Sequence, residues 1–376
     1  MKIGEKHYRS IWWEENDPAV IKIIDQERLP FFLEIKELHT VKDVYDSICS
    51  MKVRGAPVIG SAAAFGIWLA TLGMSRISSA EGKLSDAAKY LISSRPTAVN
   101  LAWAVNSMLA GLSGITSLEE LRETALRSAL GIYNNEIENC LAIGRHGVGI
   151  IEEISRKKKG SPVNILTHCN AGWLACIDWG TATSPIYLAR DRKIPVHVWV
   201  DETRPRNQGA RLTTFELSNE NIPNTLIVDN TGGHLMQQGM VDVVITGSDR
   251  TAISGDTANK IGTYLKALAA KDNNVPFYVA LPSSSIDFKI TDGIKEIPVE
   301  ERDPSELTDI QGINNGKIIS VRLCPDYTKA VNFGFDITPA RLISGLITER
   351  GICSASENGI KNMFKDKLAQ NYGRGC

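Results

Sequence analysis

Four short polar segments carry the residue types that could do acid–base chemistry on an anionic substrate. They cover residues 168–172, 201–209, 247–260 and 282–287. Cys169, in the first segment, is followed by small residues that predict the start of a helix, and a helix N-terminus can lower the pKa of a thiol. Taken alone, however, Cys169 fits a buried structural cysteine better than a reactive one.

The third segment adds a carboxylate and two cations. Asp249 and Arg250 are adjacent, and taken alone they fit a surface ion pair. Asn259 and Lys260 are predicted to lie in the first turn of a helix, where a lysine suits a phosphate group. A lysine that only contacts water is the alternative. Together the four segments favour acid–base chemistry beside an anion-binding group.

These segments follow short apolar runs that predict β-strands. The runs cover residues 163–167, 195–200, 241–246 and 275–281, and a fifth covers 225–228. Several lack alternation, which is typical of strands that are buried on both faces. Strands that alternate with helical segments predict an α/β fold with an open parallel sheet. Ligands bind outside the carboxyl ends of such strands, so the polar segments are predicted to converge on one edge.

The rest of the chain is predicted to be mixed. Short strands are expected at 31–36 and 38–41, and a helix at 41–51. The run 57–74 is uncharged and at the lower edge of the length that spans a membrane, but its small residues favour a closely packed buried helix. Residues 117–159 are predicted to be helical, with a capping box that begins at Ser117. An apolar helix is predicted after Thr338 and Pro339, within 336–349.

Composition excludes several classes of protein. The 376 residues hold 42 Lys and Arg against 43 Asp and Glu, a net charge of −1, so there is no basic surplus for a nucleic-acid backbone. The N-terminus mixes charges and does not resemble a secretory signal. No P-loop and no correctly spaced G-x-G-x-x-G occurs. His168, His197 and His234 are dispersed and are predicted to be structural or one step removed from reacting groups.

The cysteines indicate a reducing compartment. They are odd in number and contain no C-x-x-C pair, which argues against a zinc site and against a disulfide scaffold. We therefore expect a cytoplasmic protein without a membrane anchor. The seven positions are Cys49, Cys140, Cys169, Cys176, Cys324, Cys353 and Cys376.

Six ordered blocks resemble one known family. They are VRGAPVIG (53–60), SRPTAVNL (94–101), THCNAGWLA (167–175), DETRPRNQGARLTTFEL (201–217), GSDR (247–250) and GDTANKIGTY (255–264). The family holds the methylthioribose-1-phosphate isomerases, ribose-1,5-bisphosphate isomerase, and the regulatory α, β and δ subunits of translation initiation factor 2B. The resemblance spans roughly residues 30–350.

The resemblance implies a small mixed N-terminal domain at 1–140 and a Rossmann-like catalytic domain at 141–376. It also implies a homodimer that interconverts a 5-substituted ribose 1-phosphate and the matching ribulose 1-phosphate without cofactor or metal. The family's catalytic residues fall on Cys169 and Asp249. Its substrate-binding residues fall on Arg54, Gly55, Ala56, Arg95, Gln208, Asn259 and Lys260.

The chemistry of the reaction fits these assignments. The phosphate on C1 prevents simple opening of the sugar ring, so a positioned acid must protonate the ring oxygen, and Asp249 is our candidate. Cys169 would act as the base for a C2-to-C1 hydrogen transfer, or would stabilise a direct transfer. Arg54, Arg95 and Lys260 would bind the phosphate, while Gln208 and Asn259 suit sugar hydroxyls.

Departures from the family pattern leave alternatives open. The usual Asn-Pro-Ala-Phe-Asp becomes NFGFD at 332–336, and Ala171 and Ser248 are small changes. A 5-deoxyribose 1-phosphate or ribose 1,5-bisphosphate isomerase is the enzymatic alternative. A non-catalytic regulatory subunit is the alternative from another class, although such a subunit has no need of Cys169 and Asp249 together.

Overall fold

The computed structural model describes residues 1–95 and 98–372. Pro96 and Thr97 of the SRPTAVNL block, and Cys376, lie outside the described residues. The chain divides into two units, which we describe separately. Unit 1 is Met1–Leu141 with Gly172–Gly180, and unit 2 is Ala142–Ala171 with Thr181–Cys376. The boundary expected between residues 140 and 141 stays a prediction.

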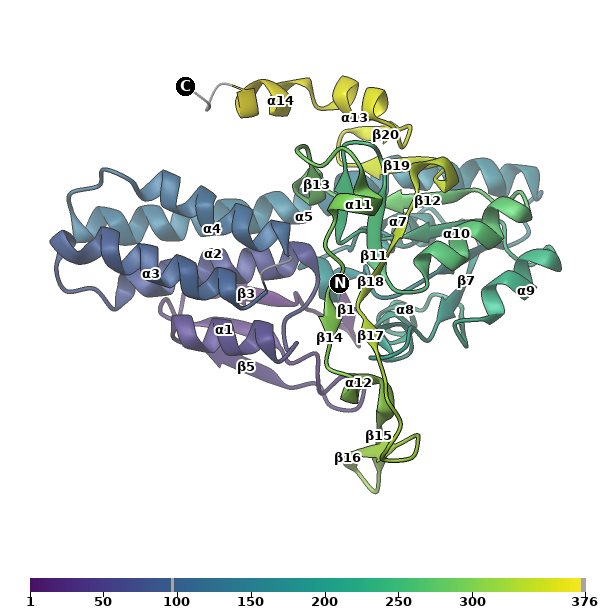
Figure 1. Cartoon of the computed structure of the whole chain (residues 1–376), viewed down its shortest axis with the longest axis horizontal. Coiled ribbons are helices and arrows are strands. Elements are labelled where there is room, and N and C mark those ends of the chain that lie inside the picture. Colours follow the sequence, from purple (N-terminus) through teal and green to yellow (C-terminus); the bar gives the residue numbers. More distant parts are fainter. Residues whose placement is uncertain (96–97, 373–376) are drawn as a thin grey trace. The chain divides into compact units, whose positions relative to one another are not determined.

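Unit 1 combines small antiparallel sheets with a group of helices (Figure 1). In the three-stranded sheet, Ile21 of the central strand faces Leu38 of the last. That last strand is the only one described near 31–41, so the expectation of two strands there was wrong. The strands are β1 Lys2–Ile3, β2 Lys6–His7, β3 Ile11–Trp13, β4 Ile21–Ile24 and β5 Ile35–Leu38. The helices are α1 Val41–Cys49, α2 Ala56–Leu72, η1 Ile77–Ser79, α3 Ala80–Ser93, α4 Val99–Leu112 and α6 Trp173–Cys176.

Helix α2 forms the core of unit 1. Every residue of this helix except Ala70 and Leu72 is buried. Gly60 lies where an added Cβ would be 3.1 Å from the Asn100 carbonyl oxygen, so the small residues allow α2 and α4 to approach closely. The predicted buried helix is confirmed. No helix in the described part of the chain is long and apolar enough to cross a membrane.

Helix α5, Leu118–Lys157, begins in unit 1 and ends in unit 2. The Glu120 N–H donates to Ser117 Oγ at 3.5 Å, which is one half of the predicted capping box. The helix predicted at 117–159 is therefore confirmed to within two residues at each end.

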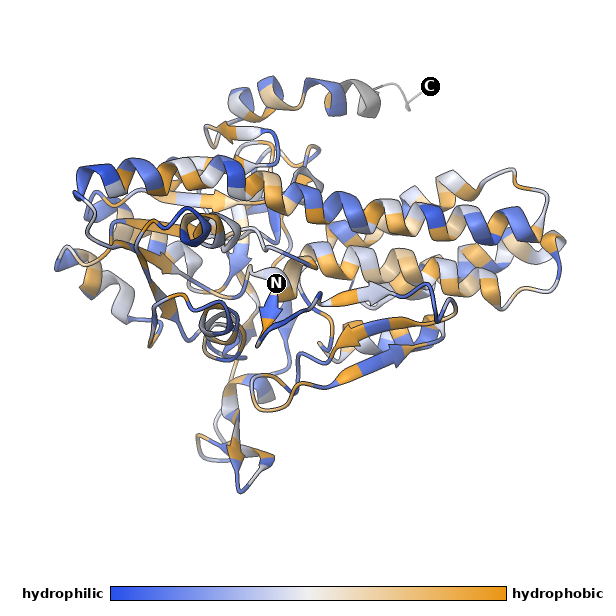
Figure 2. Ribbon diagram, turned by 180° about the vertical axis from the view of Figure 1, so that it is seen from behind, coloured by the Kyte–Doolittle hydropathy of each residue, from blue (hydrophilic) through white to orange (hydrophobic). Residues whose placement is uncertain are grey.

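Unit 2 contains a seven-stranded sheet in the order β20-β19-β12-β9-β6-β7-β8. All five predicted strands lie in it and pair in parallel, which confirms the open parallel sheet. Its strands are mostly hydrophobic (orange in Figure 2), as expected where both faces are covered. Helices α7 and α9 contact β7, and α10 contacts β9 and β12. The strands are β6 Val163–Thr167, β7 Val196–Asp201, β8 Asn224–Ile227, β9 Val243–Thr246, β12 Phe277–Ala280, β19 Gly345–Thr348 and β20 Gly351–Cys353.

Unit 2 contains a second sheet, in the order β13-β10-β11-β18, and its strand β10 is the next strand after β9 along the chain. Smaller pairs join β14 to β17 and β15 to β16. The remaining strands are β10 Arg250–Ala252, β11 Thr257–Lys260, β13 Ile286–Asp287, β14 Glu301–Arg302, β15 Asp309–Asn314, β16 Lys317–Arg322, β17 Asn332–Phe333 and β18 Phe335–Thr338. The helices are α7 Ser184–Asp191, η2 Gly209–Thr213, α8 Thr214–Asn219, α9 Thr231–Gln237, α10 Thr263–Asp272, η3 Ser283–Ser285, α11 Gly293–Glu296, α12 Ser305–Thr308, η4 Ala340–Leu342, α13 Glu357–Met363 and α14 Lys365–Tyr372.

The helix predicted within 336–349 was wrong. Only the single turn η4 follows Pro339, and the chain then enters β19, which pairs with β12. All four residues of β19 are buried. A strand buried on both faces shows the same uninterrupted apolar run as a buried helix, so the Thr-Pro start signal misled the prediction.

Gly55 offers a test of unit 1. Its φ is +99°, and an added Cβ would lie 2.5 Å from the Ala175 carbonyl oxygen. We expect Gly55→Ala to destabilise the protein by at least about 2 kcal/mol in thermal or urea unfolding. Gly82→Ala is the matched control, since nothing lies near that position in α3 and alanine should stabilise by about 0.5–1 kcal/mol. Equal stability of the two variants would contradict this account.

Candidate active site

The segments after the carboxyl ends of three adjacent strands, β9, β6 and β7, carry three of the predicted site residues of unit 2. Cys169 follows β6 by two residues, Gln208 lies in the segment after β7, and Asp249 follows β9. Because the strands are parallel and adjacent, their ends meet at one edge of the sheet. The predicted convergence is confirmed for these three segments.

The fourth polar segment follows β12, which pairs in parallel with β9, so it begins at the same edge, and its strand β13 pairs with β10 just after Asp249. The Ser283 N–H donates to Glu349 Oε2 at 2.9 Å, and the Ser283 hydroxyl donates to the other oxygen of the same carboxylate. Lys367 donates to that hydroxyl as well. The polar groups of Ser283 are thus used inside the fold.

Cys169 has a left-handed backbone, with φ of +68°. Side chains with a Cβ are rare in this region, and such strain persists only where neighbouring groups fix it. Here the Cys169 N–H donates to Thr203 Oγ1 at 2.8 Å, and Thr213 Oγ1 donates to the Cys169 carbonyl at 2.7 Å. Two threonines from the segment after β7 therefore hold the turn that presents the thiol. The side chain is partly exposed.

The helix expected directly after Cys169 is only one turn. This turn is α6, and it folds as part of unit 1. Backbone strain fixed by threonines therefore replaces the predicted helix N-terminus as the special feature of Cys169.

Cys140 and Cys176 are both buried in unit 1, in contrast to Cys169. The pKa of the Cys140 thiol is raised well above its ordinary value. The main cause is its hydrogen bond with the Cys176 side chain, and the second is burial. We therefore expect the thiol of Cys140 to be unreactive near neutral pH.

Asp249 lies against the second sheet of unit 2. Its N–H donates to the Ala258 carbonyl at 3.0 Å, which places it beside Asn259. The neighbouring Arg250 has its Nε 3.8 Å from Asp287, a residue of β13. Arg250 therefore has a carboxylate partner on another strand.

The prediction that Asn259 and Lys260 lie in the first turn of a helix was wrong, because both residues lie on β11. Both side chains are buried, and α10 begins only at Thr263. Asn259 Nδ2 donates to Thr263 Oγ1 at 3.0 Å, and Lys260 Nζ lies 5.1 Å from the ring centroid of Phe335. The two residues therefore lie on the strand that pairs with β10, next to the segment that carries Asp249.

Gln208 carries an unpaired polar atom. Its side chain is 4% exposed, and Oε1 has no hydrogen-bond partner among the described residues. A buried amide oxygen without a donor costs free energy that a ligand hydroxyl can recover. This fits the predicted role of Gln208 in binding a sugar hydroxyl.

The other four predicted residues lie in unit 1. Arg54 is buried, Gly55 is the N-cap of α2, and Ala56 is the first residue of that helix. Arg95 follows α3 and its Nη1 lies 3.8 Å from Met51 Sδ. Their assignment to substrate binding stays a prediction.

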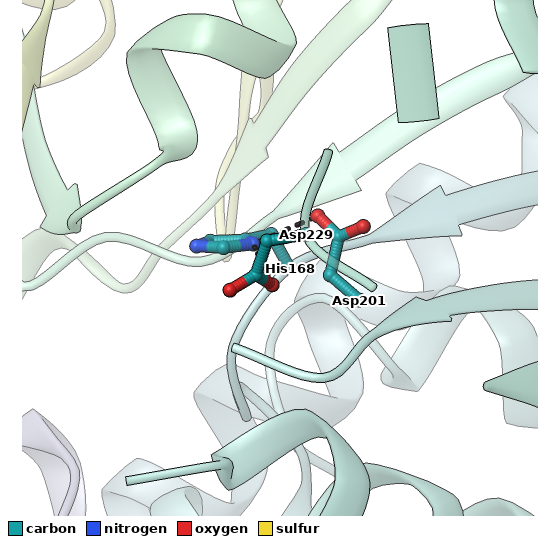
Figure 3. A group of neighbouring side chains, drawn as sticks. All are labelled: His168, Asp201 and Asp229. Carbon is teal, nitrogen blue, oxygen red and sulfur yellow. Dashed lines mark hydrogen bonds and ion pairs between the residues drawn. The ribbon is translucent and has the colours of Figure 1, made fainter. Parts of the chain in front are cut away.

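Sequence reasoning missed one charged cluster at the same sheet edge, drawn in Figure 3. His168 Nδ1 lies 2.8 Å from Asp201 Oδ2 and 3.9 Å from Asp229 Oδ1. Lys266 Nζ lies 3.1 Å from the same Asp201 oxygen. His168 and Asp201 directly adjoin the polar segments, but their pairing joins residues of different strands and leaves no signal in local spacing.

Asp229 and Asp336 complete the charged surroundings of this cluster. The Asp229 oxygens accept from the N–H groups of Thr203 and Arg204. Burial raises the pKa of Asp336, and backbone N–H groups of Gly262 and Tyr264 oppose that shift.

The geometry of this cluster argues against a metal centre. His168, Asp201 and Asp229 each offer an atom, and these atoms lie within 4.8 Å of one another. However, the Lys266 ammonium already lies against Asp201, and both Asp229 oxygens are occupied by backbone donors. A divalent ion would compete with a fixed cation, which disfavours its binding.

The parallel sheet, with polar segments at the carboxyl ends of its strands, defines an open α/β protein, a class in which ligands bind at those strand ends. A model of the Initiation factor 2 subunit family matches residues 52–355, and the chain belongs to this family. The predicted resemblance is thereby confirmed, as is the combination of a small N-terminal domain with a Rossmann-like C-terminal domain.

Relatives within the family differ in their described roles. Methylthioribose-1-phosphate isomerase of Desulfatibacillum aliphaticivorans is 53% identical over 368 residues, 98% of this chain and 100% of that protein. The crystal structure of 5-methylthioribose 1-phosphate isomerase from Pyrococcus horikoshii OT3 has a TM-score of 0.82 at 34% identity, and covers 96% of this chain and 97% of that one. The crystal structure of translation initiation factor eIF-2B subunit delta from A. fulgidus has a TM-score of 0.79 at 36% identity, over 96% of this chain and 100% of that one.

The hydroxyl of Thr203 offers a test of the Cys169 turn. Thr203→Val removes the acceptor of the partly buried Cys169 N–H, so we expect a loss of about 1–3 kcal/mol in urea unfolding. Thr225→Val is the control, because the Thr225 hydroxyl contacts only His197 at an exposed position and should change stability by less than about 0.5 kcal/mol. A Thr203 variant as stable as the control would refute the role of this hydrogen bond.

Proposed function

We propose that this chain is an aldose–ketose isomerase that converts 5-methylthioribose 1-phosphate into 5-methylthioribulose 1-phosphate, without a cofactor. The observation that carries the proposal is the placement of Cys169 and Asp249 at the ends of adjacent strands. Relatives that match nearly the full chain at 51–53% identity are named for this reaction. The name of these relatives also implies that this chain catalyses a step of methionine salvage.

Asp249 is the proposed acid. An aldose 1-phosphate cannot open its ring simply, because the C1 oxygen carries the phosphate. A proton must reach the ring oxygen as its bond to C1 breaks, and a carboxylic acid at this position supplies it. Asp249 is partly buried, and its backbone N–H donates to the Ala258 carbonyl, which fixes the position from which its side chain extends.

Cys169 is the proposed partner in hydrogen transfer. As a thiolate it would remove the C2 hydrogen to form an enediol and return it to C1. In a direct C2-to-C1 transfer it would only stabilise the transition state. In either case the two threonine contacts fix the thiol in advance, which lowers the cost of reaching the transition state.

The remaining proposed roles concern binding. Lys260, Arg54 and Arg95 supply cations for the phosphate, and Gly55 and Ala56 supply a close backbone approach. Gln208 and Asn259 bind sugar hydroxyls, since both are buried amides. The Asn332-to-Asp336 segment departs from the family pattern, so 5-deoxyribose 1-phosphate is the rival substrate.

The decisive experiment compares three sugars and two variants. The wild type should isomerise 5-methylthioribose 1-phosphate with a higher kcat/KM than 5-deoxyribose 1-phosphate or ribose 1,5-bisphosphate. Cys169→Ser and Asp249→Asn should each lose at least about 100-fold in kcat, because each removes a positioned acid or base. Both variants should still be protected against heat by substrate, through binding linkage.

Cys176→Ser is the matched control for this experiment. Cys176 is buried away from solvent, so the variant should lose about 1–3 kcal/mol of stability while its folded fraction keeps near-normal kcat. A wild type that turns over none of the three sugars would instead support a non-catalytic regulatory subunit. Normal turnover by Cys169→Ser would remove that residue from the chemistry.

We further propose a cytoplasmic homodimer that binds neither nucleic acid nor membranes. The balanced charge supports the absence of nucleic acid.

The β15–β16 hairpin supports the dimer, since two strands alone are marginally stable in water. Ile319 and Val321 lie on one face of the hairpin and are exposed, as is Leu323 just beyond it. A second copy of the chain would cover this face.

Light scattering after gel filtration tests the dimer. The wild type should elute with twice the 41.2 kDa mass of one chain, and Val321→Glu should shift it toward the monomer. Ile294→Glu is the control, because Ile294 is at least as exposed as Val321 but lies on α11, outside the hairpin. A monomeric wild type at micromolar concentration would contradict the proposal.

A further inference from the structure

His168 is buried, and each of its ring nitrogens has a polar partner. Its Nε2 lies 2.8 Å from the Ile261 carbonyl oxygen, and its Nδ1 lies 2.8 Å from Asp201 Oδ2. A carbonyl cannot donate, so the contact with Ile261 requires a hydrogen on Nε2. The Lys266 ammonium lies 3.1 Å from the same Asp201 oxygen.

The charged groups around this ring come from four different elements. Asp201 ends β7, Asp229 follows β8, Lys266 lies on α10, and Asp336 lies on β18. Asp201 is fully buried, and its second oxygen, Oδ1, has no hydrogen-bond partner among the described residues. The contacts of His168 and Lys266 with the other oxygen are thus what satisfies this side chain. Removing either contact would leave a buried polar group less well paired.

The two hydrogen bonds of the ring join parts of the candidate site that are distant in sequence. His168 directly precedes Cys169, and Ile261 directly follows Lys260. Asp201 lies two residues before Thr203, which holds the Cys169 N–H. The His168 ring therefore connects the Cys169 turn, the segment that carries Asn259 and Lys260, and the end of β7.

We infer that His168 is a positioning residue, which through the contacts of its two ring nitrogens fixes the Cys169 turn relative to the segment that carries Lys260. The inference rests on the proposed function for its catalytic consequence. His168 does not touch the substrate in this account. It acts by holding groups that do, so its loss should misplace them without removing them, which is costly where geometry decides the rate.

Steady-state kinetics of His168→Gln test this role. Glutamine cannot keep both contacts of the ring. We expect kcat to fall between about 10- and 100-fold with KM changed less than about three-fold, because misplacement acts mainly on the transition state. Asp201→Asn should lower kcat similarly, and the double variant should lose no more than the worse single variant.

His197→Gln is the matched control. His197 lies on β7 of the same sheet, contacts Thr225 Oγ1 at 2.9 Å and packs edge-on against Trp199. Its kcat should stay within about two-fold of the wild type. A purely structural role of His168 would lower the melting temperature but leave kcat per folded molecule unchanged, and that result would overturn the inference.

Nitrogen NMR of ¹⁵N-histidine-labelled wild type tests the same inference without any variant and without turnover. The Nε2 nitrogen of His168 should carry a hydrogen, as its contact with the Ile261 carbonyl requires, and a ring whose Nε2 is bare would overturn the proposal even if His168→Gln fails to fold. A wild type that isomerises none of the three sugars would refute the proposed function instead, so the two failures are distinguishable.

Discussion

The carboxylate of Asp201 is the charge around which the candidate site is built. It is fully buried at the end of β7, where an isolated anion would cost several kcal/mol. His168 and Lys266 both contact it through one oxygen. Because these two residues come from the end of β6 and from α10, the contacts that satisfy one buried carboxylate also join the segments that carry Cys169 and Lys260.

The sequence alone predicted the parallel sheet well. Strands such as β6 and β9 are buried on both faces, so their apolar character is visible without knowledge of their neighbours. The same property produced the error at 336–349, because β19 is equally apolar and follows a Thr-Pro pair that resembles a helix start. Asn259 and Lys260 were misplaced for the opposite reason. Their polar side chains do not resemble a strand, yet both are buried on β11.

The candidate site could be predicted only in part. Cys169, Gln208 and Asp249 follow strands, so their convergence follows from topology. The groups that fix them do not. Thr203 and Thr213 hold the Cys169 turn through contacts that depend on how the segment after β7 folds back. Such pairings join residues more than thirty positions apart and leave no local pattern.

The left-handed backbone of Cys169 sets stability and activity against each other at a single position. Glycine adopts this conformation without strain, so the fold by itself would favour glycine at residue 169. In the proposed mechanism a thiol is needed at this residue, and that need opposes the preference for glycine. Under that mechanism, directed evolution for thermal stability alone would drift toward an inactive protein at residue 169. Selection that includes turnover would have to accept the strain and gain its stability elsewhere in the chain.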